Sequence, residues 1–519
     1  MSNGTPAGRI TDASDLRRDV EERPDVCVVG SGPGGSVVAA RLAARGLRIV
    51  LVEEGGHYPP ESMKMDEAWA YPSLYQERAQ RATADLAITV LQGRGVGGGT
   101  LVNWTTSYRT PARVLRHWAD RFGVSGLDEK SLEPHFAAVE ERLDIHAWPL
   151  DQVNPNNRVL WDGAARMGWD KSVTRRNVTA CQNLGYCGTG CPVGGKNSAD
   201  LTYVADAVRD GAKVYARARV VRLEKSGRRI AAVHAQAVDA ITGKPTGRKV
   251  VVRPKLVVLS AGAFGTPEIL LRSGYDPSGR VGKRTFLHPV VASSAIFDRP
   301  IQGFYGAPQS VASHHFADRG TGKVGFFLEA APVHPILAGI SLGGFGAEHE
   351  EQMAQLASSS ALLALSIDGF LPDEEGGTVS LRRDGRVRLD YAIRPEIWEA
   401  LREGNKALAR VQLAAGARVV YSFHESPVVI RSETDVGLLD RAPWQPLRVG
   451  VFSAHAMGGC AMGRDPEKSV VDSRLKLHWL DNVYVVDGSV FPTGLGVNPQ
   501  ETIFGIAHWA SDHIAAATG

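Results

Sequence analysis

The sequence predicts an α/β fold organised around a nucleotide-binding βαβ unit. Residues 25–29 form a short, continuous apolar run, as a buried parallel strand requires. A glycine-rich loop follows at 30–35, and an Ala-, Val- and Leu-rich stretch at 36–45 is typical of a helix. A second apolar run at 48–52 completes the order strand, loop, helix, strand.

The glycine loop matches the dinucleotide-binding pattern G-x-G-x-x-G. Gly30 permits a tight turn, Gly32 lets the backbone approach a pyrophosphate, and Gly35 lets the helix pack closely on the strand. Glu53 ends the second strand, where a carboxylate can accept hydrogen bonds from a ribose. The motif predicts a dinucleotide site but does not distinguish FAD from NAD.

Composition indicates a globular enzyme of two or three packed units. The chain has 519 residues, of which 43% are hydrophobic and 22% charged. A formal net charge of +3 argues against nucleic acid as a partner. No run of about 18 apolar residues occurs, so no transmembrane segment is expected. Five cysteines, a low and odd number, and the absence of a signal peptide predict a cytoplasmic protein.

The rest of the chain predicts a second unit. Residues 1–23 are polar and are expected to be loosely held, whereas 113–170 are expected to be mostly helical. Residues 290–450 alternate strand-like and helical runs without a further glycine motif, so we assign them to substrate binding. A helix is expected at 198–210, and strands at 213–223 and 249–260.

Four further segments resemble the glucose–methanol–choline (GMC) family of flavin oxidoreductases. The segment 93–103, with sequence GRGVGGGTLVN, is similar to the family's second glycine loop, and 259–274 is similar to its second signature. That signature usually continues with an aliphatic residue and glycine, where this chain has Tyr275 and Asp276. The C-terminal segments are 483–489 and 496–502.

The resemblance implies an α/β fold (α+β overall) with a discontinuous Rossmann-like FAD-binding domain and an antiparallel-sheet substrate-binding domain. The expected FAD-binding segments are 24–110, 195–290 and 453–519. Residues 111–194 and 291–452 are expected to form the substrate-binding domain with its lid and Cys-rich loop.

The resemblance also implies particular contacts with FAD. Gly97, Gly98 and Asn103 would lie along the flavin, Val220 would meet the adenine through its backbone, and Asp487 would face the ribityl–phosphate region. Some relatives tether the flavin through a histidine where this chain has Val102, so non-covalent FAD is expected.

His455 and Asn498 correspond to the family's catalytic pair. A neutral imidazole suits removal of a hydroxyl proton, because its pKa lies near the working pH. An amide can donate a hydrogen bond to a developing alkoxide. Asn498 also precedes a proline and suits a turn. His288, in the segment Leu-His-Pro, is expected to have a structural role.

Cys181, Cys187 and Cys191 leave three alternatives open. Three nearby thiols can ligate an iron–sulfur cluster, form a disulfide or remain free. Relatives with such a cluster begin the segment with two adjacent cysteines, and Ala180 stands at the first of these positions here. No metal site is therefore assigned.

The predicted reaction is oxidation of an alcohol to an aldehyde or ketone, with hydride transfer to flavin N5. The closest resemblance within the family, to long-chain alcohol oxidases, favours an apolar or aromatic alcohol. Oxygen, a quinone or a carrier protein could accept the electrons. The alternatives are a hydroxynitrile-lyase-like C–C lyase on the same fold and an alcohol dehydrogenase whose iron–sulfur cluster feeds a cytochrome or quinone.

Overall fold

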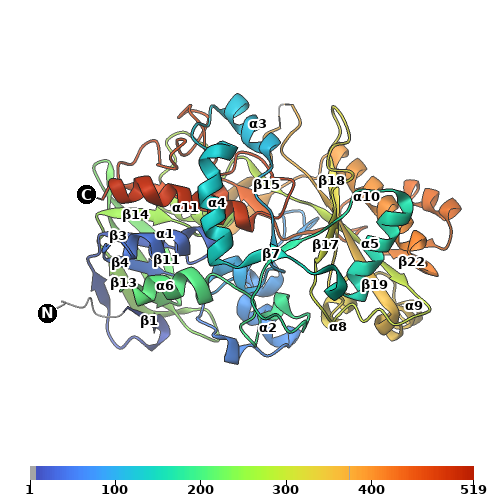
Figure 1. Ribbon diagram of the computed structural model, residues 1–519. Helices are drawn as coiled ribbons and strands as arrows, with labels where there is room; N and C mark the ends of the chain where they lie inside the picture. Colours follow the sequence, from blue (N-terminus) through green and yellow to red (C-terminus); the bar gives the residue numbers. More distant parts are fainter. Residues whose placement is uncertain (1–7, 373, 519) are drawn as a thin grey trace.

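The computed structural model describes residues 8–372 and 374–518, which form two packed halves (Figure 1). One half is built on a parallel six-stranded sheet, and the first and last described residues lie on its side of the molecule. Its strands, in order across the sheet, are β1 (Arg9–Asp12), β10 (Lys213–Ala216), β4 (Ile49–Val52), β3 (Val26–Val29), β14 (Leu256–Leu259) and β26 (Val483–Val485).

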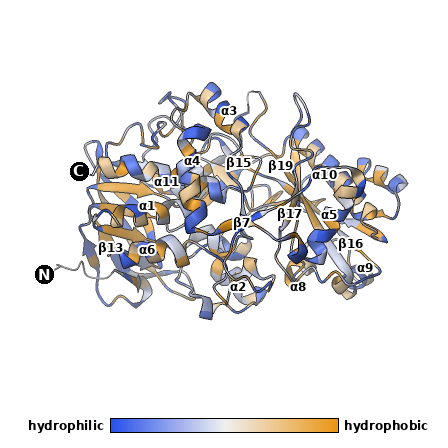
Figure 2. Cartoon of the chain, in the orientation of Figure 1, coloured by the Kyte–Doolittle hydropathy of each residue, from blue (hydrophilic) through white to orange (hydrophobic). Residues whose placement is uncertain are grey.

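The central strands of this sheet are apolar because both faces are covered. Every residue of β3, β4 and β14 is buried, and these strands are hydrophobic along their length (Figure 2). Helix α1 (Pro33–Ala43) contacts β3 and β4 and packs against α11 (Gln500–Ala516). The predicted βαβ unit is therefore confirmed, although its helix begins at Pro33 rather than at residue 36.

The strand expected at 213–223 is two strands in different sheets. Arg217 separates β10 from β11 with a φ of 53°, a left-handed conformation that breaks the extended backbone. Residues 1–23 were expected to be loosely held, and from residue 8 onward this was wrong, because β1 is an edge strand of the six-stranded sheet and β2 is an edge strand of the second sheet. Residues 1–7 lie outside the described residues. The second sheet contains β11 (Ala218–Ser226), β12 (Arg229–Val238), β13 (Pro245–Val252) and β2 (Val20–Glu22).

The other half is built on a nine-stranded sheet whose central strands are antiparallel. Its main path runs through β23 (Val429–Ile430), β22 (Val419–Ser422), β16 (Val290–Ile296), β19 (Ser359–Ser366), β18 (Phe326–Ala330), β17 (Val311–Ser313) and β8 (Ser172–Val173). Off this path, β24 (Phe452–Ser453) pairs with β16, and β5 (Thr89–Val90) pairs with β24.

Side-chain alternation gives this sheet two different faces. Leu328 and Leu362 belong to the core formed with α5 (Pro155–Met167) and α10 (Pro395–Ala414). Phe327 and Leu363 point the other way and belong to a separate apolar cluster. A functional site can form on this second face because those helices cover only the first.

The remaining elements support the predicted fold class, which is confirmed. Two of the helices, α3 and α4, lie with α5 in the segment expected to be helical. The helices are α2 (Glu67–Leu74), α3 (Ala112–Phe122), α4 (Glu129–Arg142), α6 (Ala205–Arg209), α7 (Gly262–Arg272), α8 (Pro335–Ser341) and α9 (Ala347–Ala354). The short strands are β6 (Thr106–Ser107), β7 (Ile145–Ala147), β9 (Arg175–Asn177), β15 (Thr285–Leu287), β20 (Thr378–Leu381), β21 (Val387–Asp390) and β25 (Ala456–Gly458).

Within residues 8–372 and 374–518, no helix combines the length and apolar character needed to span a membrane. The domain boundaries expected from the sequence stay a prediction.

Candidate active site

The first glycine loop joins β3 to α1 and leaves the start of the helix open. Gly30 has a φ of +96°, and a Cβ there would lie 2.2 Å from the carbonyl oxygen of Ser260. A Cβ at Gly35 would lie 2.0 Å from the carbonyl oxygen of Gly30. Gly32 caps α1 without a side-chain hydrogen bond, so the N–H groups of the first turn can bind an anion.

The second glycine loop packs directly on the first. Gly97 and Gly98 have φ values of +107° and +58°, and a Cβ on Gly98 would lie 2.7 Å from the Cα of Gly32. The loop continues to Asn103, whose side-chain amide donates a 2.6 Å hydrogen bond to Gln500 at the start of α11. Two loops distant in sequence therefore form one surface of exposed backbone.

Glu53 ends β4 beneath these loops and is fully engaged by the protein. One carboxylate oxygen accepts hydrogen bonds from the N–H (3.1 Å) and hydroxyl (2.7 Å) of Ser31, and the other accepts from the N–H of Gly55 (2.8 Å). Burial raises the pKa of Glu53, and these donors oppose the shift. The oxygen that accepts from Gly55 has a second lone pair, and a ribose contact there stays a prediction.

The remaining predicted cofactor residues lie on other elements of the same half. Asp487 follows β26, and its carboxylate accepts hydrogen bonds from Thr266 (2.6 Å), Gly262 (2.9 Å) and the N–H of Ser489 (2.8 Å). Burial raises its pKa. Val220 is buried in β11, beside β12. Their contacts with a cofactor also stay predictions.

His455 and Asn498 lie side by side, between the two halves of the molecule. His455 connects β24 to β25, and Asn498 precedes α11. The side-chain nitrogen of Asn498 is 3.4 Å from Nε2 of His455. On the other edge of the ring, Nδ1 of His455 is 3.0 Å from Nδ1 of His288, which is fully buried.

The two imidazoles are neutral at ordinary pH. Loss of hydration lowers the pKa of His455 to about 4 and holds that of His288 well below its usual value. The N–H of Gly496 donates to Nε2 of His288 at 3.2 Å, which places the His288 proton on Nδ1, facing His455. His455 then accepts at Nδ1 and carries its own proton on Nε2, so the amide nitrogen of Asn498, itself a donor, contacts Nε2 without a hydrogen bond.

Comparison with known protein families identifies the family of this chain. Two GMC oxidoreductase models match residues 71–290 and 372–507, and a model of an NAD(P)-binding Rossmann-like domain matches 28–58. The chain belongs to the GMC oxidoreductase family. It is therefore an oxidoreductase, and the resemblance inferred from the sequence is confirmed.

Individual relatives agree with the assignment. An uncharacterized GMC-type oxidoreductase of Mycobacterium tuberculosis is 32% identical over 95% of this chain and 76% of its own length. A long-chain-alcohol oxidase of Arabidopsis thaliana is 30% identical over 95% of this chain and 67% of its own length. Two solved structures share the fold. Pyridoxine 4-oxidase from Mesorbium loti has a TM-score of 0.70 and 20% identity, over 94% of this chain and 98% of that chain. Formate oxidase from Aspergillus oryzae has a TM-score of 0.73 and 16% identity, over 96% of this chain and 99% of that chain.

FAD is the cofactor of this GMC oxidoreductase. The structure fits it, because Gly32 and Gly98 bring bare backbone together and α1 offers an uncapped first turn. Space also remains beside Gly99, where a Cβ would meet no atom within 4 Å. The residues that would hold FAD are those of the two glycine loops, with Glu53 and Asp487 supporting them.

Sequence reasoning missed two residues of this region. His288 was expected to be only structural, yet it contacts the predicted base directly. Glu329 was not singled out, although it is fully buried near Asn498. The segment Leu-His-Pro carried a weak signal for His288. Glu329 had none, because a single acidic residue in a strand usually faces solvent.

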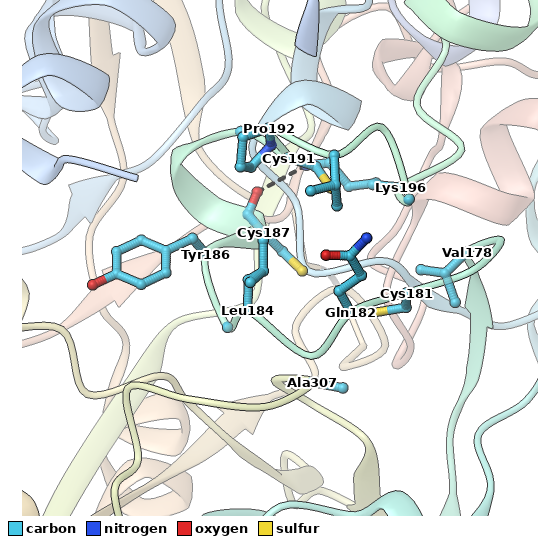
Figure 3. Close-up of a pocket in the computed structure, with 14 residues that line it drawn as sticks. Val178, Cys181, Gln182, Leu184, Tyr186, Cys187, Cys191, Pro192, Lys196 and Ala307 are labelled. Carbon is cyan, nitrogen blue, oxygen red and sulfur yellow. Dashed lines mark hydrogen bonds between the residues drawn. The ribbon is translucent and has the colours of Figure 1, made fainter. Parts of the chain in front are cut away.

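The cysteine-rich loop forms a separate pocket (Figure 3). Cys181, Cys187 and Cys191 line it, are half-buried and form no disulfide in this structure. The buried ammonium of Lys196 donates to the carbonyl of Cys187 at 2.8 Å. The described part of the chain contains no group of three or more His, Cys, Asp and Glu side chains arranged to hold a metal ion.

Proposed function

We propose that this protein oxidises the CH–OH group of an alcohol to an aldehyde or ketone, with His455 removing the hydroxyl proton. Bound FAD supplies the hydride acceptor, at N5 of its flavin. The observation that supports the proposal most is the contact between His455 and Asn498, which unites a proton acceptor and an amide donor beside the cofactor half.

Each residue has a distinct task in this reaction. Nε2 of His455 accepts the hydroxyl proton, which makes the carbinol carbon a better hydride donor. The amide of Asn498 donates a hydrogen bond to the substrate oxygen as negative charge develops there. Contacts with neighbouring residues hold both side chains in position, His455 beside His288 and Asn498 beside His455.

Proton abstraction requires the hydrogen bond between His288 and His455 to reverse its direction, so that the donor becomes the acceptor. In the free protein, Gly496 sets the proton of His455 on Nε2. To act as a base, His455 must instead carry that proton on Nδ1 and donate it to His288. His288 then accepts at Nδ1 and holds the active tautomer of His455. Its own proton moves to Nε2, so the hydrogen bond from the Gly496 N–H must break.

An apolar or aromatic alcohol suits the surroundings of this site. Phe327, Leu363 and Leu365 form an apolar surface on the face of the sheet away from α5 and α10. The likeness to long-chain-alcohol oxidases supports the same substrate class. Oxygen, a quinone or a carrier protein would reoxidise the flavin. The absence of a histidine at Val102 supports non-covalent FAD, and the low cysteine count supports a cytoplasmic location.

The decisive experiment is anaerobic addition of alcohols to the purified holoprotein. An oxidoreductase of this type loses the yellow absorbance of its flavin when alcohol is added, and an aldehyde or ketone appears in equal amount. A C–C lyase keeps its flavin oxidised and instead cleaves a hydroxynitrile. Flavin that stays oxidised with every alcohol class would refute the proposal.

Iron analysis of the same holoprotein tests the cluster-containing dehydrogenase. A cluster would add iron and visible absorbance outside the flavin bands. Ala180 stands where relatives with a cluster have the first of two adjacent cysteines, so we propose an enzyme that uses FAD without an iron–sulfur cluster.

A further inference from the structure

Glu329 is a buried carboxyl group with one oxygen left without a partner. It lies in β18 and is fully buried. Oε2 accepts a hydrogen bond from Gln309, which itself accepts one from Thr106 at 2.9 Å. Oε1 has no hydrogen-bond partner, and no Lys or Arg pairs with Glu329 anywhere in the described chain.

Strand alternation aims this carboxyl toward the catalytic face of the sheet. Glu329 lies two residues from Phe327, whose ring packs against His288 with ring centres 5.7 Å apart. The neighbours Leu328 and Ala330 point to the opposite face, into the core with α5 and α10. Asn498 is close enough to interact with the Glu329 carboxyl as well as with His455.

Other buried polar atoms around Glu329 also lack partners. These atoms are Oδ1 of Asn498, the hydroxyl of Tyr108 and Nε2 of His314. Tyr108 and His314 are in edge contact, with ring centres 5.3 Å apart, and His314 stacks on Phe327 at 5.2 Å. The unpartnered atoms therefore line one side of the site that contains His455.

Such a group is costly unless a ligand completes it. A buried polar atom without a hydrogen bond destabilises the folded state, and a charged one does so more strongly. A carboxyl group placed for structural reasons would normally be paired with a cation or fully hydrogen-bonded. Glu329 shares its site with the catalytic pair, so the missing partner is expected to come from the substrate.

Resting on the proposed function, we infer that the alcohol oxidised here carries a second hydrogen-bond-donating group, a hydroxyl or an ammonium, which binds Glu329. The apolar residues of the same face contact the carbon skeleton between the two groups. Glu329 is then a specificity-determining residue, and it takes no part in the proton or hydride transfer.

The electrostatics of Glu329 suit both kinds of donor. Burial raises its pKa to about 8, so the free protein holds it largely as a neutral acid near pH 7. Because Oε2 accepts from Gln309, the neutral acid carries its proton on Oε1, and a substrate hydroxyl can accept a hydrogen bond from it there or donate to Oε1 once the acid is ionised. An ammonium would favour the carboxylate and displace its proton, because a desolvated charge pair compensates for burial.

The test compares alcohols of equal length with the holoenzyme under anaerobic conditions. The probes are n-alkanols, the matching diols with hydroxyls at both ends, and the matching ω-amino alcohols. We expect kcat/KM for flavin reduction to be at least about tenfold higher for the diol or amino alcohol than for the alkanol. A preference for the diol identifies a hydroxyl as the donor, and a preference for the amino alcohol identifies an ammonium.

The variants Glu329→Gln and Glu329→Met separate specificity from folding. Glu329→Gln retains an oxygen for Gln309, so it should unfold at the same temperature as the parent or higher. It should lose the preference for amino alcohols. Glu329→Met should lose the preference for both donors, so that kcat/KM for the diol and for the amino alcohol falls to the value for the alkanol.

Two results would overturn the inference, and each differs from failure of the proposed function. Equal kcat/KM for alkanols and their diol and amino counterparts in the parent would show that no second group is bound. An equal loss of rate with all three probes in Glu329→Met would make Glu329 structural. If no alcohol reduces the flavin, the proposed reaction itself is wrong.

Discussion

Buried carboxylates are treated differently in the two halves of this GMC oxidoreductase. In the cofactor half, both oxygens of Glu53 and both oxygens of Asp487 accept hydrogen bonds from the protein. In the substrate half, Glu329 has a hydrogen bond from Gln309 at one oxygen and none at the other. Glu53 and Asp487 hold their loops in place through hydrogen bonds within the protein, whereas Glu329 has one oxygen free to bind a ligand.

This difference separates two ways of building a site. The cofactor loops are rigid because their geometry depends on glycines and on local hydrogen bonds. The catalytic side depends on three side chains from distant segments, His288, His455 and Asn498, which only tertiary packing brings together. Substitutions in the first region should affect cofactor binding, and substitutions in the second should affect reaction rate.

The largest expected effect is that of His455→Ala. Loss of the base should slow flavin reduction by alcohol by roughly 10²–10⁴-fold while FAD remains bound. Stopped-flow absorbance under anaerobic conditions measures this rate, and the absorbance spectrum of the purified variant reports the FAD content. An unchanged reduction rate would remove His455 from the reaction.

Asn498→Ala should have the next largest effect. Removing the donor to the developing alkoxide typically costs about 10²-fold in rate, and the fold should survive because Asn498 makes no backbone hydrogen bond through its side chain. The same stopped-flow assay applies. A reduction rate close to that of the parent would leave Asn498 as a turn residue before Pro499.

Gly98→Ala should weaken cofactor binding instead of the chemical step. The new methyl group would lie 2.7 Å from the Cα of Gly32, at a φ of +58°. Strain of about 1–3 kcal/mol corresponds to a roughly 5–150-fold weaker affinity for FAD. Titration of apoprotein with FAD measures it. Gly437→Ala, where a Cβ meets no atom within 4 Å, is the matched control and should bind FAD like the parent.

His288 variants test the coupling between the two imidazoles. His288→Phe removes the acceptor for Nδ1 of His455, and flavin reduction should slow by about tenfold. His288→Asn offers an oxygen at a similar position and should recover part of that loss. If both variants reduce flavin at the parental rate, His455 does not depend on His288 for its tautomer.

The smallest effect is a pH dependence of stability. Folding raises the pKa of Glu329 from its ordinary value near 4.5 to about 8, so between these two pH values the folded state keeps the proton that the unfolded state has lost. Its contribution to stability is complete below the lower value and is lost as the pH rises through about 8. Urea unfolding of the parent and of Glu329→Gln should therefore diverge by about 1–3 kcal/mol between pH 5 and pH 8, with the parent less stable at pH 8. Parallel curves would mean that Glu329 is not shielded from solvent.

Much of the cofactor half could be predicted from sequence because its signals are local. Gly30, Gly32 and Gly35 lie within one loop, and the strands on either side are continuous apolar runs. The substrate half gave weaker signals. The run Phe326–Ala330 shows one acidic residue among apolar ones, and only the packing of neighbouring strands reveals that this residue is buried. His288 and His455 are 167 positions apart, so their contact depends on the pairing of β15 with β25.

The chain passes between the two halves twice at the catalytic centre, once through His288 and once through His455. The first passage connects β15 to β16 and the second connects β24 to β25, and the strands pair on both sides, β15 with β25 and β16 with β24. The two imidazoles therefore lie on two neighbouring connections between the same pairs of strands. Because the strands before and after both rings pair with one another, the contact between the two imidazoles is fixed from both sides.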